Sequence, residues 1–212
     1  MNKQTGFTLI ELAIVLVIIG LLLGGVLRGQ ELINSAKVKN MARDFQNVQV
    51  YIYGYQDKFK ALPGDDRAAA AHTGGTAATT GGTLGNGVIE GEWDSTTTTE
   101  ESALFWQHVR FAGLAAGPTN TADAAYFPTN ADGGRIGVQS VSTMTEITGM
   151  TGAYAVCSTG ILGKFAKQLD TTLDDGETST GSVRAVVVGT PGAGVTTATI
   201  NDSNTYTVCM AF

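Results

Sequence analysis

The sequence predicts an α+β protein in which a long N-terminal α-helix packs on a small antiparallel β-sheet. Three observations carry this prediction. Residues 7–27 are almost entirely apolar, a narrow apolar stripe continues to residue 59, and short β-branched segments bounded by Gly or Asn occur in the C-terminal half. The length of 212 residues suits one domain on a long stalk.

The apolar segment 7–27 is long enough to cross a membrane. Its 21 residues match the roughly 20 that a spanning helix needs. A cleaved secretory signal would instead have about 7–15 apolar residues and a small-residue cleavage site, whereas Arg28 and Gln30 come next here. Lys3 precedes the segment, so the positive-inside rule places the start of the chain in the cytoplasm and the remainder outside it.

Beyond the apolar segment, apolar residues recur at alternating steps of three and four, as on one face of a helix. The stripe consists of Val38, Met41, Phe45, Val48, Ile52, Tyr55 and Phe59. No proline lies between residues 7 and 62, so one helix of roughly 80 Å can contain both stretches. We expect the stripe to be core packing under the rest of the chain and not the lining of a ligand site.

The remainder of the chain, residues 61–212, is expected to form a head. Pro63 and Gly64 end the long helix, and the Gly-, Thr- and Ala-rich residues 64–99 predict a long surface loop with little core of its own. Thr99 is expected to cap a short helix ending near Gly113. A second short helix is expected at 162–169. The expected strands are 135–141, 153–157, 182–188 and 205–211.

A single carboxylate, Glu11, lies at the start of the apolar segment, where an unpaired charge is costly. Residues 6–12 read GFTLIEL, with Lys3 before them and the apolar run behind. This stretch resembles the type IV prepilin, or class III signal, motif. The resemblance implies that prepilin peptidase cuts between Gly6 and Phe7, that Phe7 is then N-methylated, and that the head and helix have a pilin fold.

Cleavage at this motif would create an ammonium group at Phe7, one helical turn before Glu11. We expect the two charges to pair, within one chain or between neighbouring subunits, because buried charges are tolerated only when they are paired. Pairing between subunits would also set the axial register of a filament. The alternative is that Glu11 stays solvated at the headgroup level.

The resemblance divides the chain into four parts and adds a disulfide. The parts are a leader (1–6), a transmembrane or filament-core helix (7–27), an amphipathic continuation (28–60) and a globular head (61–212). Cys157 and Cys209 are the only cysteines, and in an exported head they most simply form one disulfide, as pilins commonly do in their C-terminal region. The alternative is a pair of reactive thiols.

The implied function is that of a structural subunit of a type IV pilus or pilus-like filament. Such a subunit waits as a single-pass protein in the bacterial inner membrane with its head in the periplasm, and then enters a periplasmic or extracellular filament. Its partners would be prepilin peptidase/methyltransferase, other pilin subunits in a helical homo- or hetero-polymer, a platform protein and an assembly ATPase. The alternatives are a type II secretion pseudopilin, a minor tip subunit that binds a surface, DNA or secreted cargo, and a membrane-anchored enzyme.

Composition and motifs argue against two of these classes. There are 19 acidic and 13 basic residues, and no basic run, so binding to nucleic acid is not expected. The sequence has no P-loop, G-x-S-x-G or H-E-x-x-H motif, so we expect no enzyme activity. We expect His108 to lie on the face of an amphipathic helix and not to act as a base.

Two acidic clusters raise the question of a cofactor, since Ca²⁺ prefers several carboxylate oxygens on a glycine-containing loop. The first comprises Asp65, Asp66, Glu90 and Glu92, with Asn86 between them, and the second comprises Asp170, Asp174, Asp175 and Glu177. Neither has the spacing of an EF-hand. We expect ordinary turn and cap chemistry, and hence no cofactor, with Ca²⁺ at either cluster as the alternative.

Overall fold

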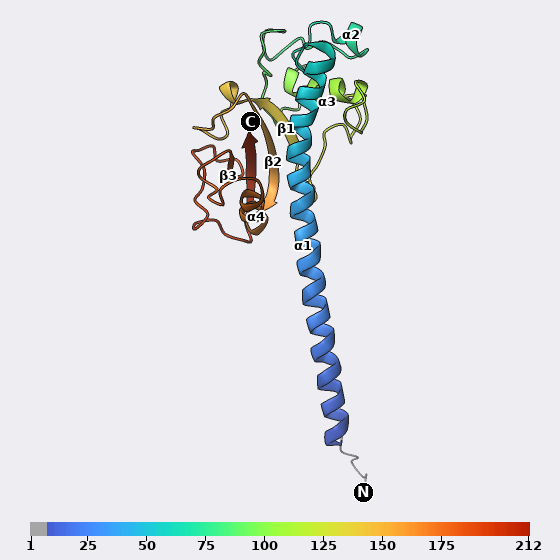
Figure 1. Ribbon diagram of the computed structural model, residues 1–212, viewed down its shortest axis with the longest axis vertical. Coiled ribbons are helices and arrows are strands. Elements are labelled where there is room, and N and C mark those ends of the chain that lie inside the picture. The colour runs from blue at the N-terminus through green and yellow to red at the C-terminus, as the bar shows by residue number, and fades with distance from the viewer. Residues whose placement is uncertain (1–7) are drawn as a thin grey trace. The chain divides into compact units, whose positions relative to one another are not determined.

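The computed structural model describes residues 8–212 (Figure 1). Its elements are α1 (Leu9–Phe59), α2 (Ala69–His72), α3 (Glu101–Phe111), β1 (Ile136–Ser140), the 3-10 helix Val141–Thr143, β2 (Tyr154–Leu162), α4 (Gly163–Leu173), β3 (Val183–Val187) and β4 (Thr205–Ala211). The chain divides into two compact units, of which one ends at Lys37 and the other comprises Val38–Phe212. This composition of one long helix and a small sheet confirms the predicted α+β class. The predicted boundaries of leader, core helix, continuation and head stay a prediction.

Helix α1 is continuous through both the apolar segment and the stripe. It is helical at each of the glycines that weaken helix propensity, which are Gly20, Gly24, Gly25 and Gly29. The helix ends at Phe59, and the next residue, Lys60, takes a left-handed conformation with φ 56°. Pro63 then prevents any continuation.

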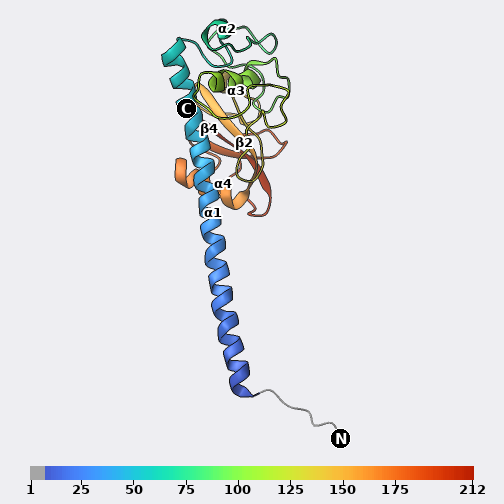
Figure 2. The ribbon, with the colours of Figure 1, turned by 90° about the vertical axis from the view of Figure 1, so that its right-hand side faces the viewer.

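The stripe is the buried face of α1, as predicted. Six of its seven members are buried, from Val38 to Tyr55, and only Phe59 at the end of the helix is partly exposed. In the unit Val38–Phe212 the five stripe members from Val38 to Ile52 join one hydrophobic cluster with Val138, Val156 and Val208 of the sheet. The C-terminal half of α1 therefore covers one face of the sheet, as Figures 1 and 2 show.

The sheet is antiparallel throughout, with the strand order β1-β2-β4-β3 (Figure 1). All four expected strands are present, but β2 extends beyond the predicted end at residue 157, to Leu162. A bulge between Ser158 and Ile161 contains Gly160 at φ 72°. The turn-forming residues therefore produce an irregularity within the strand and do not end it. The second short helix expected from the sequence is α4. It begins directly after β2 and is longer than the predicted 162–169.

The opposite face of the sheet has its own, smaller core. Trp93, Ile147 and Met150 pack there against the alternate residues of the strands, among them Cys157 and Cys209. Because successive residues of a strand point to opposite faces, one sheet serves both clusters. The head is thus a sheet covered by helices on one side and by ordered loops on the other.

Residues 64–99 are not the coreless surface loop that was expected. Ile89 and Trp93 are buried, and both dock on β1: the Ile89 N–H donates to Ser140 Oγ at 2.8 Å and the Trp93 N–H donates to Gln139 Oε1 at 2.7 Å. A Cβ on Gly137 would lie 1.8 Å from the Trp93 carbonyl oxygen, so glycine alone permits this approach. The prediction failed because two apolar residues in a polar stretch show no periodicity.

The cap of α3 also differs from the prediction. Glu100 is the residue before the helix, and no side chain caps it. The Thr99 hydroxyl is 2.7 Å from the Thr80 hydroxyl instead, beside the isolated bridge between Thr80 and Glu100. Helix α3 is held by burial, since every residue from 101 to 110 is buried.

Candidate functional site

The start of α1 is built from Thr8 and Glu11. The Glu11 carboxylate accepts hydrogen bonds from the Thr8 N–H and the Thr8 hydroxyl, both at 2.8 Å, and the Glu11 N–H donates to Thr8 Oγ1 at 3.3 Å. This reciprocal pattern is a capping box, which satisfies N–H groups that have no partner within the helix. The Thr-x-x-Glu spacing of residues 8–11 is visible in the sequence and is the signal from which the capping role could have been predicted.

The predicted cleavage and methylation residues, Gly6 and Phe7, lie outside the described residues. The described part of the chain starts with the helix cap at Thr8, and α1 begins at Leu9. Glu11 is exposed, and its pairing with a processed terminus stays a prediction.

The N-terminal part of α1 presents an apolar surface on all sides. None of the residues from Leu9 to Leu27 is buried, and the helix is long and apolar enough to cross a membrane. A helix that is hydrophobic all round belongs in a membrane or in the core of an assembly. Together with the sequence motif, this surface indicates that the chain is anchored in a membrane.

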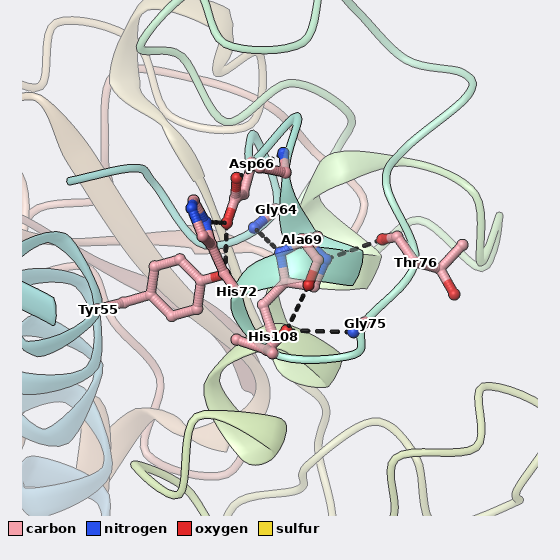
Figure 3. Close-up of polar contacts among 10 residues, drawn as sticks. Tyr55, Gly64, Asp66, Ala69, His72, Gly75, Thr76 and His108 are labelled. Carbon is pink, nitrogen blue, oxygen red and sulfur yellow. Dashed lines mark hydrogen bonds and ion pairs between the residues drawn. The ribbon is translucent and has the colours of Figure 1, made fainter. Parts of the chain in front are cut away.

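At the C-terminal end of α1, a polar network centres on the buried carboxylate of Asp66 (Figure 3). The Tyr55 hydroxyl donates to Asp66 Oδ2 at 2.7 Å, and His72 Nδ1 lies 2.7 Å from the same oxygen. The Ala68 N–H donates to Oδ1. These bonds lower the pKa of Asp66 although its burial acts in the opposite direction, so the carboxylate is a charged anchor between α1 and α2.

His108 is fully buried on α3, so the expectation of an amphipathic-face residue is wrong. Its Nδ1 accepts from the Gly64 N–H at 2.9 Å, and its Nε2 lies 2.8 Å from the Thr76 carbonyl oxygen, to which it donates (Figure 3). Burial lowers its pKa, and both ring nitrogens are occupied by the backbone. The imidazole fixes the 64–76 segment, and sequence periodicity could not reveal this because α3 is buried on every side.

Cys157 and Cys209 form a disulfide, as expected. They are direct partners in the register of β2 and β4, 52 residues apart in sequence. The bond lies on the sheet face opposite α1, beside Trp93. It links two strands that are separated by a long loop in the sequence. In the chain-entropy model a disulfide that closes such a loop adds about 4 kcal/mol to the free energy of unfolding.

The residues of the first acidic cluster have separate tasks. Asp65 accepts hydrogen bonds from the N–H groups of Gly85 and Gly87, and Asp66 belongs to the network described above. Glu90 accepts from the Thr83 N–H, and Glu92 accepts from the Thr145 hydroxyl at 3.2 Å. Each of these carboxylates accepts hydrogen bonds from other residues of the head, and a metal at this cluster stays an untested alternative.

The second acidic cluster does bring side chains together. One carboxylate oxygen from each of Asp170, Asp174 and Asp175 lies within 4.8 Å of the others at the C-terminal end of α4. The fourth candidate, Glu177, accepts from the Thr197 N–H and from Ser179 through the same oxygen, Oε1. Among the described residues, an aspartate cluster is therefore present at this place.

Comparison with known families gives one match, to the prokaryotic N-terminal methylation motif at residues 1–27. Comparison of the chain with curated proteins and with solved structures finds no match. The matched residues are the predicted leader and the apolar segment. This supports a type IV pilin-like class III signal peptide and a pilin- or pseudopilin-like substrate of prepilin peptidase.

Proposed function

We propose that this chain is a structural subunit of a type IV pilus or pilus-like filament, cut between Gly6 and Phe7 and N-methylated at Phe7. One observation carries the proposal. The methylation motif at residues 1–27 overlaps a helix whose residues 9–27 have no buried side chain. An apolar surface of this length needs a membrane before assembly and neighbouring helices after it.

The division of burial within α1 supports a filament role. Large apolar side chains of the first half are exposed, as with Leu16 at 70% and Leu21 at 73%, while the stripe of the second half is used by the head. The head therefore requires nothing from the first half for its own core. That half is free to pack against the same segment of other subunits while the head lies at the filament surface.

Processing is tested by Gly6→Ala in the native host, because the resemblance makes Gly6 the residue before the cut. We expect the variant to keep residues 1–6, as measured by the intact mass of the membrane protein. Gly20→Ala is the matched control, since a Cβ at Gly20 meets no atom within 4 Å. A Gly6→Ala protein that still begins at methylated Phe7 would overturn the leader assignment.

The capping box allows the charge of Glu11 to be tested apart from its hydrogen bonds. Glu11→Gln keeps an acceptor at the third helical position and removes the charge, whereas Glu11→Ala removes both. If Glu11 pairs with the processed terminus, both variants are cut and remain in the membrane but yield few filaments. Normal filament yield from Glu11→Gln would assign the residue to capping alone.

The position of the subunit in the filament separates the proposal from its alternatives. A structural subunit labels the whole length of purified filaments when an epitope is placed in the head. A label confined to filament ends would favour a minor tip subunit that binds a surface, DNA or secreted cargo. Loss of protein secretion with normal pili on deletion would favour a type II secretion pseudopilin.

A further inference from the structure

Three carboxylates converge where α4 ends. Asp170 lies in the last turn, Asp174 is the residue after the helix, and Asp175 is next in the chain. One oxygen of each lies within 4.8 Å of the others. Ca²⁺ binds oxygen at about 2.3–2.6 Å, so two ligands on opposite sides of the ion are up to about 5 Å apart. The three oxygens can therefore share one ion of this size.

Asp170 is the member that a simple surface cluster does not explain. Its side chain is 0% exposed, and its Oδ1 accepts from the Gly176 N–H at 3.2 Å. Its Oδ2 is buried and has no hydrogen-bond partner among residues 8–212. A buried carboxylate oxygen without a partner carries a desolvation cost that nothing in its surroundings offsets.

The electrostatic surroundings make this cost larger. Burial, together with the neighbouring Asp175, Asp174 and Glu177, raises the pKa of Asp170 to about 6. The carboxylates also lie at the C-terminal end of α4, where the helix dipole is negative and favours cations. Every one of these influences acts against a negative charge at Asp170, and a bound cation would offset each of them.

Arg184 is a charged group of opposite sign that acts on the cluster, and it does so at Asp175. The pKa of the exposed Asp175 is lowered mainly by the hydrogen bonds from the Glu177 N–H and the Thr180 hydroxyl, and the charge of Arg184 acts in the same direction. Its guanidinium donates to backbone carbonyl oxygens, at 3.2 Å to Thr148 and 3.3 Å to Gly181, with a weaker bond to Ala193. The arginine therefore holds loops together beside the cluster.

The other two carboxylates are already oriented by the chain. Asp174 Oδ2 accepts from the N–H groups of Ser182 and Val183, at 2.5 and 2.9 Å. Asp175 accepts from the Glu177 N–H at 2.8 Å and from the Thr180 hydroxyl at 2.9 Å. The cluster is thus preorganised, and ion binding would not require the loop to fold.

We propose that the loop after α4 binds one hard divalent cation of the size of Ca²⁺ through the carboxylates of Asp170, Asp174 and Asp175. The site joins the end of α4 to the start of β3, so the ion stabilises the head. Glu177 is not assigned as a ligand, because the group of oxygens that lie within 4.8 Å of one another comes from Asp170, Asp174 and Asp175. The site is independent of the proposed filament role, and its test does not require filaments.

The test uses the full chain, purified in detergent and stripped of metal with a chelator, at about pH 8, well above the pKa of about 6 of Asp170. Calorimetric titration with CaCl₂ should show one site, with a Kd in the range of about 10⁻⁴–10⁻³ M typical of extracellular Ca²⁺ modules. The midpoint of thermal unfolding should rise with CaCl₂. No saturable binding, or no rise in the midpoint, would overturn the proposal.

The decisive variant is Asp170→Asn, which keeps an acceptor for the Gly176 N–H and removes the buried charge. We expect Ca²⁺ affinity to fall at least about tenfold and the rise in melting temperature to disappear. Without Ca²⁺ the variant should melt at or above the temperature of the unchanged protein, which shows that it folds. Equal Ca²⁺ responses in the two proteins would assign binding elsewhere.

Two controls complete the design. Asp123→Asn changes the net charge equally at an exposed position outside the cluster and should bind Ca²⁺ unchanged. Titration with MgCl₂ should give affinity at least about tenfold weaker, because Mg²⁺ demands near-octahedral geometry at about 2.0–2.1 Å. Equal affinity for the two metals would contradict the assigned ion size.

Discussion

The two halves of α1 are one helix with two different surroundings. In the first half, apolar residues occupy every face and are exposed, as with Leu16 at 70%. In the second half they occupy one stripe that the head buries, as with Phe45 at 1%. The apolar pattern of a helix therefore indicates what the helix packs against. A stripe on one face indicates a single packed surface, whereas apolar residues on every face indicate a membrane or several neighbouring helices.

The largest expected effect contrasts these halves directly. Phe45→Ala removes a fully buried ring from the core and should lower the free energy of unfolding of the head by about 3–5 kcal/mol. Leu16→Ala, in the exposed half, should leave it unchanged. Fluorescence-monitored urea unfolding reports the head alone, since the two tryptophans, Trp93 and Trp106, are both there. Equal destabilisation by both changes would mean that the halves are not energetically separate.

A second prediction concerns Glu101, whose side chain is 1% exposed. Its Oε1 has no hydrogen-bond partner in the described part of the chain. Burial raises its pKa from 4.5 to about 7, with Asp65 and Glu90 acting in the same direction. The folded state therefore keeps a proton that the unfolded state has lost, so the stability of the head falls as the pH rises from about 4.5 through about 7.

Glu101→Gln tests this linkage, because glutamine keeps the acceptor for the Glu90 N–H and cannot ionise. At about pH 5 the variant and the unchanged protein should have similar stability, and above about pH 8 the variant should be more stable by about 2–3 kcal/mol. Urea unfolding at the two pH values measures the difference. A constant difference at both values would contradict the linkage.

The smallest expected effect lies at the end of α1. Lys60 adopts φ 56°, a left-handed conformation that glycine tolerates better. Its exposed ion pair with Asp57, at 3.2 Å, contributes little. Lys60→Gly should raise the free energy of unfolding of the head by up to about 1 kcal/mol, which is measured as a higher melting temperature. Lys60→Ala breaks the same ion pair without the gain in backbone freedom, and a rise with alanine would refute this explanation.

Elements with a local sequence signal were predictable. The apolar segment was found by its length, the stripe of α1 by its steps of three and four, and the four strands by β-branched residues bounded by Gly or Asn. The disulfide was expected from the presence of only two cysteines in the chain. These features depend on local chemistry or on counting.

Contacts between segments that lie far apart in the sequence were not predictable. Trp93 docks on Gln139, and His108 joins Gly64 to Thr76. No pattern within either segment signals the other. The acidic clusters looked alike in the sequence, and only the fold separated the loop ties made by Asp65 and Glu90 from the convergence around Asp170.

The strand order has a consequence for the timing of folding. Strand β4 is last in the sequence, yet it lies between β2 and β3 and supplies every sheet partner of β3. During vectorial synthesis, β1 and β2 can pair early, whereas β3 must wait unpaired until residues 205–211 have emerged. The sheet of the head is therefore completed late, when β4 becomes available to pair with β3.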